Sequence, residues 1–309
     1  MPKSKPNIAR VDPHTPESGL FKVRPKNAPR LHAEEFITVV ETEDGPLEIK
    51  YATPYALNHV DLRIFLAAVG MCSADPEALA QNDTEPAQKG LWDKFLTKGI
   101  ATNMPAAKIK TTSYALAKAA GIAWGDRQAQ RISDSLEKMA SVSSTWRKGS
   151  KVTSGSQMLS FAHDEDSREL VIAISPHFAK AILGEANRYI QISLNEMREL
   201  KHPAATVLHM VISSRLGLGG KRKEREMFIN IDKLAEACYG TAKNAEQTRQ
   251  RRKQIAAALE ELHQLDYWFT TYNPDTHKVH IHRTKPDNTH LEDMMKNVEK
   301  IEKELNKED

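Results

Sequence analysis

The sequence predicts an α+β fold made of two tandem winged-helix domains related by internal duplication. Two stretches of the chain repeat the order of short strand, helix, turn, longer helix and hairpin, which is typical of a winged helix. Apolar residues of the two longer helices also recur at a common offset of 123 positions, in the pairs Ile132 and Ile255, Leu136 and Leu259, and Met139 and Leu262. Duplication of one ancestral unit explains both observations.

The composition is that of a globular protein large enough for two domains. The chain has 309 residues, of which 40% are hydrophobic and 28% are charged. Its two cysteines, Cys72 and Cys238, lie far apart, so we expect neither a disulfide framework nor a zinc site. The N-terminus lacks the apolar run of a signal peptide, and no stretch approaches the roughly 20 apolar residues of a membrane helix. We therefore expect a cytoplasmic protein without a membrane partner.

Charge is unevenly distributed along the chain. Residues 1–30 carry seven Lys and Arg against two acids, and residues 215–253 carry eleven against five. Residues 284–309 are acidic, with five Lys against eight acids. A concentrated basic segment is typical of proteins that bind polyanions, although a solvated charged face has the same composition.

Four segments follow from these patterns. The proline-rich, basic start of the chain predicts a flexible arm, and the acidic end predicts a helix. The expected segments are a flexible basic arm (1–35), an N-terminal winged-helix domain (36–184), a C-terminal winged-helix domain (185–285) and an acidic C-terminal helix (286–309).

The N-terminal domain is expected to open with a hairpin and a buried helix. "FITVVETEDGPLEIKYA" alternates on both sides of a turn at Asp44-Gly45, and "HVDLRIFLAAVGM" predicts the helix. Residues 73–98 are polar, and we expect a loop there with a short helix around 91–95. "KIKTTSYALAKAAG" then predicts a strand and a helix, with an N-cap among residues 111–113 and an end at Gly121. "DRQAQRISDSLEKMASV" predicts the longer helix, and charged turns join the strands that follow.

The C-terminal domain repeats this order. "MFINIDKLAEACYG" predicts a strand and a helix with Asp232 as N-cap and an end near Gly240. The longer helix contains "TRQRRKQIAAALEEL", and "DYWFTTYNPDTHKVHIHRT" predicts a hairpin with its turn at Asn273-Pro274-Asp275.

The longer helix of the C-terminal domain has a basic start and an apolar end. Four of the five residues from 249 to 253 are cationic, whereas Ile255, Ala258, Leu259 and Leu262 form an apolar stripe. In a helix-turn-helix, the rear of the second helix packs on the first while its N-terminal end enters the major groove. We therefore predict that the apolar half anchors this helix and that the charged half reaches DNA.

The predicted DNA contacts follow from side-chain chemistry, because Arg suits guanine and phosphate, and Asn or Gln suits adenine. In the C-terminal domain the candidates are Asn244, Gln247, Thr248, Arg249, Arg251, Arg252 and Lys253. The upstream candidates for phosphate contact are Lys221, Arg222, Lys223 and Arg225, and the hairpin candidates are Lys278 and Arg283. The N-terminal domain offers a weaker set of Arg127, Gln128 and Arg131 on its helix, with Arg147, Lys148 and Lys151 on its expected wing.

Signals of enzymatic activity are weak. "RLGLGGKR" resembles a phosphate loop, but Arg222 stands where Ser or Thr should hold magnesium. His280 and His282 share one face of a strand and could begin a metal site. A nickase of the rolling-circle type would also need a nucleophilic tyrosine after them, and none follows Tyr272. We expect exposed histidines on the wing, no cofactor, no metal and no enzymatic activity.

The C-terminal segment spaces apolar residues three and four positions apart over two heptads, at Leu291, Met294, Val298, Ile301 and Leu305. Two heptads are fewer than a coiled coil usually needs. A helix docked on its own domain and a helix for self-association both remain possible from this pattern.

Several segments resemble, in the same order, the RepC replication initiators of IncQ-type plasmids. They include "SGLFKVRP", "DLRIFLAAVGM", "TSYALAKAAGI", "ELVIAISPHFAKAILG", "IQISLNEMRELKHPAATVLH" and "TRQRRKQIAAALEEL", and the resemblance covers roughly residues 18–283. It departs at the acidic tail, at the loop of residues 73–98 and at the basic connection "GGKRKERE".

The resemblance implies a non-catalytic bacterial protein with two winged-helix domains. Such initiators bind direct repeats (iterons) in double-stranded DNA of a plasmid origin. They help to open an adjacent A·T-rich region and pass the strands to a plasmid helicase and primase. The alternatives from the residues alone are a dimeric winged-helix transcription regulator that binds an operator and a metal-dependent origin nickase.

Overall fold

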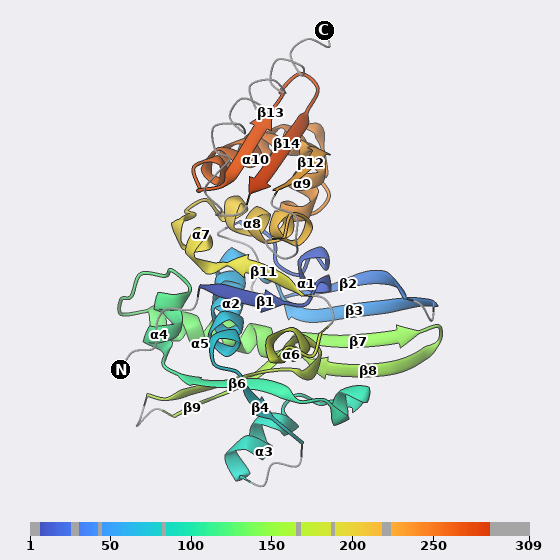
Figure 1. Cartoon of the computed structure of the whole chain (residues 1–309), viewed down its shortest axis with the longest axis vertical. Helices are drawn as coiled ribbons and strands as arrows, with labels where there is room; N and C mark the ends of the chain where they lie inside the picture. Colours follow the sequence, from blue (N-terminus) through green and yellow to red (C-terminus); the bar gives the residue numbers. More distant parts are fainter. Residues whose placement is uncertain are drawn as a thin grey trace. The chain divides into compact units, whose positions relative to one another are not determined.

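The computed structural model describes residues 7–25, 31–42, 45–81, 85–164, 168–186, 189–217 and 224–284. The chain divides into two compact units, Met1–Arg198 and Glu199–Asp309 (Figure 1). Helices and antiparallel sheets occur in both units, as expected for a mixed α and β protein. Within the described ranges, no helix combines the length and the apolar character that crossing a membrane requires.

One sheet of the first unit is built around the predicted N-terminal hairpin. Its strands β2 (Leu31–Thr42) and β3 (Gly45–Tyr55) pair antiparallel up to Thr42 and Gly45, which confirms that hairpin. Strands β7 (Ser143–Lys148) and β8 (Lys151–Gln157) form a second hairpin, and β7 pairs with β3. With β5 (Lys98–Gly99), the strand order is β2-β3-β7-β8-β5.

The other main sheet of the first unit carries the two predicted helices between its strands. Its order is β4-β6-β10-β9, formed by β4 (Glu77–Leu79), β6 (Ala106–Thr111), β10 (Leu170–Ile174) and β9 (Leu159–His163). Thr112, inside the predicted range, caps α4 (Ser113–Ala119) by accepting a hydrogen bond from Ala115 N. The longer helix, α5 (Gln128–Ala140), follows as predicted.

The core of the first unit surrounds α2 (His59–Ala74), the predicted buried helix. Asn58 and Asp61 form a capping box at its start. The helix is apolar on nearly every side because it packs against β1, α4, α5 and β6. Phe65 stacks on Phe21 and meets Phe178 of α6 (Pro176–Leu183) edge to face. Burial of this helix on several sides fixes the positions of both α4 and α5.

Residues 73–98 are more regular than the predicted loop. They contain β4 and α3 (Pro86–Asp93), which begins earlier than the helix predicted around residues 91–95. Leu79, Leu91, Trp92 and Phe95 form a buried cluster, and the 3-10 helix η1 (Ile100–Asn103) follows β5. The segment is polar in composition, which suggested a loop, but its few apolar residues are buried and hold it in place.

The prediction of a flexible arm is wrong for the described part of residues 1–35. Strand β1 (Ile8–Val11) pairs with β11 (Ile190–Ser193), and α1 (His14–Glu17) and β2 also fall in this range. Ala9, Val11 and Leu20 are buried. These few apolar residues were sufficient for packing, whereas the prolines dominated the sequence pattern.

The same pairing moves the boundary between the units. We predicted it between residues 184 and 185, but the first unit extends to Arg198 at the end of α7 (Leu194–Glu199). Strand β11 is held by β1, and Leu194 packs so closely on Gly70 that a side chain there would clash with it. Arg198 Nε donates to the carbonyl of Ala119 at the end of α4, 2.8 Å away.

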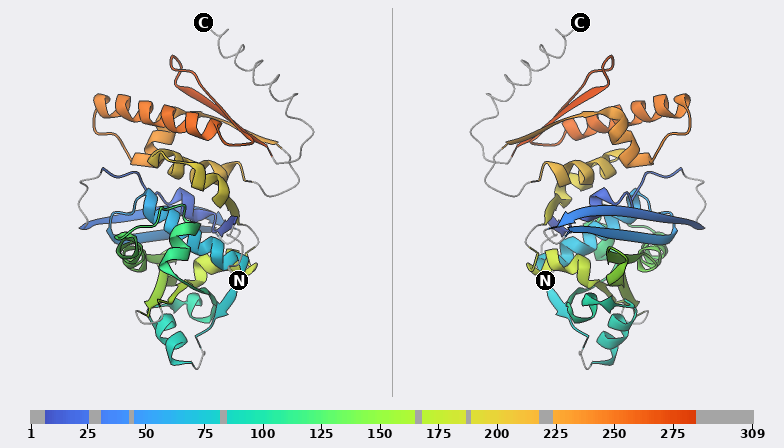
Figure 2. Two further views of the ribbon diagram at one scale, coloured as in Figure 1. Left: turned by 90° about the vertical axis from the view of Figure 1, so that its left-hand side faces the viewer. Right: turned by 90° about the vertical axis from the view of Figure 1, so that its right-hand side faces the viewer.

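The second unit contains three helices and one sheet in the described residues 199–217 and 224–284. Helix α8 (Pro203–Arg215) is buried along most of its length, and α9 (Ile231–Tyr239) and α10 (Ala245–His263) pack on it. Strands β12 (Glu224–Asn230), β14 (Lys278–Thr284) and β13 (Trp268–Tyr272) form a sheet in the order β12-β14-β13. Figure 2 shows α10 as a long rod followed by the β13–β14 hairpin.

The two units share a chain order and a strand order. In the first, β6, α4, α5, β9 and β10 follow one another, with the β7–β8 hairpin inserted after α5. In the second, the order is β12, α9, α10, β13 and β14. The last strand lies between the other two in both sheets, β6-β10-β9 and β12-β14-β13. The predicted alternation of elements is therefore confirmed in each unit.

Candidate nucleic-acid interface

The predicted division of α10 into an anchored half and a free half is visible in its burial. Ile255, Ala258, Leu259 and Leu262 are buried, and Leu265 just beyond the helix is buried as well. The buried positions of α5 are Ile132, Ser135, Leu136 and Met139. Each lies 123 residues before its counterpart in α10, so the offset found in the sequence also relates the buried faces.

Three of the predicted DNA-binding residues form hydrogen bonds within the N-terminus of α10. Asn244 Oδ1 accepts a hydrogen bond from Gln247 N at 2.8 Å, and Gln247 Oε1 accepts one from Lys243 N at 2.9 Å. Thr248 Oγ1 donates to the carbonyl of Asn244 at 3.1 Å. The bond from Gln247 N satisfies one of the N–H groups that a helix start leaves open, and the other two bonds fix the side chains of Gln247 and Thr248 to the backbone around it. The three side chains therefore have a structural role in the protein as described, whether or not they also meet DNA.

Arg251 closes the turn between α9 and α10. Its Nη1 donates to the carbonyl of Gly240 at 2.6 Å, and the guanidinium lies over the Tyr239 ring, 5.6 Å from the ring centre. Gly240 has φ +76°, which allows α9 to end there without strain. Burial raises the pKa of Tyr239. This arginine therefore connects the end of α9 to α10.

Arg252 joins α9, α10 and the β13–β14 turn. Nε and Nη2 donate to the two carboxylate oxygens of Asp232, each at 2.7 Å. These hydrogen bonds are the main reason why the pKa of Asp232 lies below its usual value. Nη1 donates to His277 Nε2 at 2.6 Å. Since Nε2 must accept, neutral His277 carries its proton on Nδ1 and can donate it to the Tyr272 hydroxyl, 3.3 Å away.

The start of α9 differs from the prediction, which had Asp232 as its N-cap. Asn230, not Asp232, caps the helix by accepting a hydrogen bond from Asp232 N at 2.8 Å. Asp232 lies two residues later, where its carboxylate receives Arg252. Asn and Asp are both good N-cap residues, so the residue type alone does not decide which of the two positions caps the helix.

Arg249, Gln250 and Lys253 are the exposed polar side chains of the 249–253 segment. The Arg249 side chain is 69% exposed and pairs with Glu246 at 2.9 Å, one turn earlier on the helix. An exposed ion pair of this kind contributes only about 0.3–0.5 kcal/mol, so a phosphate or a base can displace it. This set is smaller than the predicted one.

The two cations predicted to contact DNA from the β13–β14 hairpin differ in exposure. Lys278 is exposed at the start of β14, as a phosphate contact requires. Arg283 is 2% exposed, donates to Ser213 Oγ at 3.0 Å and lies over the Trp268 ring at 4.3 Å. The prediction of Arg283 as a DNA contact is therefore corrected, because its side chain faces the core.

The prediction of exposed histidines is wrong as well. His280 is 3% exposed and His282 is 9% exposed. His280 stacks on Phe228, with 4.3 Å between the ring centres, and contacts Glu226 at 3.2 Å. Among the residues whose placement is described, no group of three or more His, Cys, Asp or Glu side chains could hold a metal ion.

Of the four cations predicted to contact phosphate upstream of α9, the described residues include one. Lys221, Arg222 and Lys223 lie outside the described residues, as do the apolar positions of the C-terminal segment, Leu291, Met294, Val298, Ile301 and Leu305. Arg225 is described, and its side chain is half-buried on β12, where its backbone is in register with Arg283.

The helix of the first unit that corresponds to α10 also presents cations at its start. Arg127 occupies the N-cap position of α5, and both Arg127 and Arg131 are exposed. Gln128 is half-buried. Gln130 Nε2 donates to Asp134 Oδ1 at 2.8 Å along the helix. Two arginines therefore remain available on this helix, compared with Arg249 and Lys253 on α10.

The cations predicted for a wing of the first unit lie on a hairpin of the other sheet. Arg147, Lys148 and Lys151 are exposed near the tip of the β7–β8 hairpin, but this hairpin belongs to the five-stranded sheet. The strands that correspond to β13 and β14 are β9 and β10, and "DEDSRE" connects them in the sequence. This connection is acidic and would repel phosphate, so the two units differ in charge where a wing would meet DNA.

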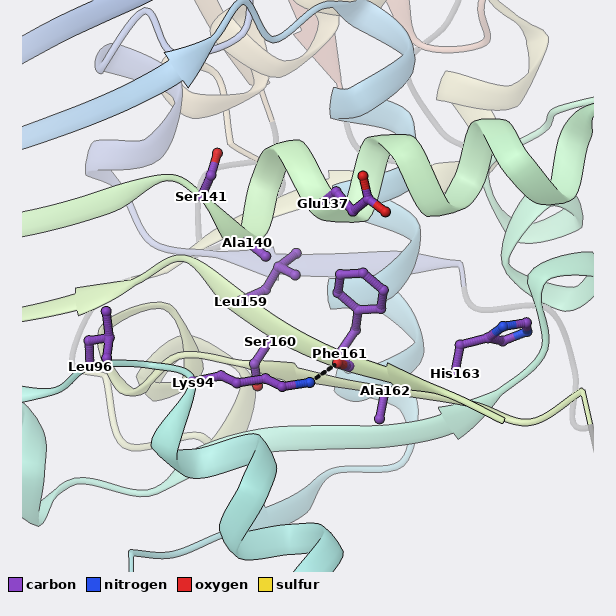
Figure 3. A pocket seen from close by; sticks show the side chains of 10 residues that line it. All are labelled: Lys94, Leu96, Glu137, Ala140, Ser141, Leu159, Ser160, Phe161, Ala162 and His163. Atoms are coloured by element: carbon purple, nitrogen blue, oxygen red, sulfur yellow. Dashed lines mark hydrogen bonds between the residues drawn. The ribbon is translucent and has the colours of Figure 1, made fainter. Parts of the chain in front are cut away.

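A groove of about 680 Å³ lies between α5, β9 and the segment after α3 (Figure 3). Glu137 lines it from α5, Phe161 and His163 from β9, and Leu96 from the segment after α3. Lys94 Nζ donates to the carbonyl of Phe161 at 2.9 Å, on the side of β9 away from β10. The scattered charges of this groove do not form an acid–base pair or an anion site.

Comparison with known proteins supplies the family. The family model described as Replication protein C (RepC) matches residues 7–285. No curated protein matches the chain. A crystal structure of domains 2 and 3 of RctB, in a selenomethionine derivative, is similar with a TM-score of 0.48 and 12% identity, over 85% of this chain and 94% of that chain.

A further crystal structure of RctB domains 2–3 has a TM-score of 0.43 and 11% identity, over 89% of this chain and 98% of that chain. Similarities at this level carry no argument about function. The family match, in contrast, spans most of the chain and agrees with the resemblance seen in its segments. The chain belongs to the replication protein C (RepC) family.

Proposed function

We propose that this protein initiates plasmid replication by binding iterons, the direct repeats of the origin, and by promoting the opening of an A·T-rich region for helicase loading. Membership of the RepC family supports a role in the initiation of DNA replication and thus DNA binding. The observation that carries the proposal is α10, whose rear is buried while Arg249, Gln250 and Lys253 are exposed on its first half. A helix anchored in this way can enter a major groove without losing its packing.

Each unit is proposed to be a winged helix, and the two to be products of duplication. The shared chain order, the shared strand order and the four buried positions at one offset support this proposal. The β13–β14 hairpin is then the wing of the second unit, with Lys278 as its phosphate contact.

The proposed readers of the iteron are Arg249, Gln250 and Lys253. Arginine can form two hydrogen bonds with guanine, and Gln can do so with adenine. Arg251 and Arg252 hold α9 and the wing in position around these readers. Asn244, Gln247 and Thr248 fix the start of the helix, which lies close to the phosphates in this binding mode. The predicted contacts from Lys221, Arg222, Lys223 and Arg225 remain predictions.

The first unit is proposed to form a second contact with the DNA repeat through Arg127 and Arg131. Opening DNA costs a few kcal/mol per unstacked base step, which further protein contacts must offset. Two helices in successive grooves of one repeat would provide such contacts. Arg147, Lys148 and Lys151 are proposed to contact phosphate from the β7–β8 hairpin. Transfer of the strands to a plasmid helicase and primase, and self-association through the C-terminal segment, belong to the same proposal.

We propose that the protein acts without enzymatic activity, metal or cofactor. The burial of His280 and His282 supports this over a nickase, because a nuclease metal must reach both the histidines and a phosphate. The test is incubation of supercoiled origin DNA with the protein and Mg²⁺ or Mn²⁺. Intact supercoils are expected, and accumulation of open circles would reverse the proposal.

Footprinting tests the initiator proposal directly. Protection of tandem direct repeats in the origin, with a bend detected in permuted fragments, is the expected result. Protection of a single inverted repeat would instead indicate the dimeric transcription regulator. Straight DNA in the permuted fragments would remove the proposed mechanism of opening.

A further inference from the structure

Two aromatic side chains of the first unit are exposed and in contact. Tyr114 is 51% exposed and Trp124 is 46% exposed. Two other tryptophans, Trp92 and Trp268, are 3% and 1% exposed, so the fold buries large rings elsewhere. Leaving an indole and a phenol in water forgoes the stabilisation that burial would give, which makes exposed aromatic pairs candidates for binding sites. The sequence signal for this pair is an aromatic residue in the glycine-flanked turn "GIAWGD".

The fold holds this pair firmly at the start of the helix-turn-helix. Tyr114 is the second residue of α4, whose cap is Thr112, and Trp124 lies in the turn that leads to α5. Gly121 has φ +69° where the turn begins, and Arg198 lies so close that a side chain there would clash. The rings meet edge to face, with 5.4 Å between their centres and 86° between their planes. This geometry leaves ring faces open for a third flat group to stack.

The charge around the pair favours an anionic ligand. Between Thr112 and Arg131 the chain carries the cations Lys118, Arg127 and Arg131 and one acid, Asp126. Lys118 lies one helical turn after Tyr114, on the same face of α4, and Arg127 follows Trp124 by three residues. Both cations are exposed. Open aromatic rings flanked by exposed cations are the combination that binds unpaired nucleotides, through base stacking and phosphate contacts.

We propose that Tyr114 and Trp124 form a site for unpaired bases of single-stranded DNA. The bases stack on the two rings while Lys118 and Arg127 contact the phosphates on either side. The proposal rests on the proposed function in one respect, since opening of the origin supplies the single strand. The first unit then has a second ligand, the single strand, which Arg127 contacts after the origin has opened, besides the duplex repeat that α5 is proposed to bind.

The test measures binding of a fluorescently labelled oligo-dT of 20 nucleotides to the full chain by anisotropy. Tyr114→Ala and Trp124→Ala should each weaken this binding about fivefold or more, because each base–ring stack contributes on the order of tenfold in affinity. Trp124→Phe, which retains a flat ring, should recover most of the affinity. Phe228→Ala is the matched control, because Phe228 is an exposed aromatic residue of the other unit, at 57%. It should bind oligo-dT like the unsubstituted protein.

Two further measurements keep the outcomes separate. Oligo-dT should quench the intrinsic fluorescence of Trp124, and Trp124→Phe should abolish that part of the signal. Binding to a duplex iteron, measured in parallel, should be unchanged in both alanine variants, which also shows that they fold. Unchanged oligo-dT binding in these variants would overturn the inference, as would an equal loss in Phe228→Ala. Failure of the unsubstituted protein to bind duplex iterons would reject the proposed function while leaving the oligo-dT result valid.

Discussion

Arg252 grips Asp232 through two parallel hydrogen bonds of 2.7 Å, from Nε to Oδ1 and from Nη2 to Oδ2. The arginine side chain is 28% exposed and the aspartate 42%, so water weakens the pair without removing it. We expect Arg252→Ala to lower the free energy of unfolding by about 1 kcal/mol, with the loss of the His277 contact included. Urea unfolding measures this change. Arg252→Lys should recover little, because an ammonium group cannot form the paired bonds.

The same pair predicts a dependence of stability on pH. Since the folded-state pKa of Asp232 is lowered, the carboxylate stabilises the fold at any pH above its unfolded value of about 3.9. This contribution is lost as the pH falls below that value and through the lowered folded-state pKa. The difference in unfolding free energy between the protein and Arg252→Ala should therefore shrink on acidification below about pH 4. A difference that stays constant down to pH 2 would contradict the assignment.

Asn244 allows helix capping to be separated from DNA reading. Asn244→Ala should cost about 1 kcal/mol of unfolding free energy, because Gln247 N loses its acceptor. Asn244→Ser restores a capping oxygen but not an amide that can pair with adenine. If capping is its only role, the serine variant should recover both stability and iteron affinity. Recovery of stability alone would show that Asn244 also contacts a base.

The sequence predicts the positions of apolar residues better than the partners of charged ones. Ile255 and Leu259 were identified as buried because apolar residues at helical spacing have one stable arrangement. Arg251 and Arg252 are predicted DNA contacts, and in the structure they already donate to Gly240 and Asp232. An arginine suits a carbonyl, a carboxylate and a guanine equally well, so its partner depends on which elements the fold brings near. That information is absent from local sequence.

Strand neighbours were equally hard to predict. Strands joined by charged turns were expected after the longer helix, but the position of β7 and β8 in the five-stranded sheet depends on the pairing of β7 with β3, which lies 91 to 101 residues earlier. The packing of β1 on β11 joins segments even further apart and involves only four residue pairs. Periodicity identifies an element, whereas long-range pairing decides which sheet it joins. The order of elements was therefore predictable, and the sheet that β7 and β8 join was not.

Arg283 should behave as a core residue. Arg283→Ala would leave a cavity over Trp268 and remove the donor to Ser213, at a cost of about 2–4 kcal/mol in urea unfolding. Arg283→Met, which preserves most of the volume, should cost clearly less. Neither variant should alter the salt dependence of DNA binding under conditions where it is folded. A shallower salt slope would restore the original prediction that Arg283 touches DNA.

The two cysteines should be inert in the folded protein. Cys72 and Cys238 are fully buried, and burial raises the pKa of both thiols, so almost no reactive thiolate is present near neutral pH. A thiol reagent such as dithionitrobenzoate is expected to label neither residue until denaturant is added, and then to label both. Labelling of one thiol at a rate independent of denaturant would show that its site opens locally.

The exposed cations of α10 give the decisive test of DNA binding. Arg249→Ala should weaken binding to an iteron duplex by about 1–3 kcal/mol if the residue reads a guanine, and should relax the preference at one base pair. Lys253→Ala should weaken all sequences alike and reduce the salt slope by about one unit if the residue contacts phosphate. Gel-shift titrations at several salt concentrations distinguish the two patterns.

The matched control for these variants is Lys201→Ala, which removes one positive charge from the segment before α8, beside the C-terminal end of α10. Lys201 N donates to Glu261 at 2.6 Å, and residue 261 lies about 18 Å along the helix from residue 249. A charge at that distance is largely screened at physiological salt. Lys201→Ala should therefore bind nearly as well as the unsubstituted protein. Glu246→Gln, which releases Arg249 from its ion pair, should bind slightly more tightly. Equal losses for Lys201→Ala and Arg249→Ala would mean that binding follows net charge, and α10 would then have no special place in the groove.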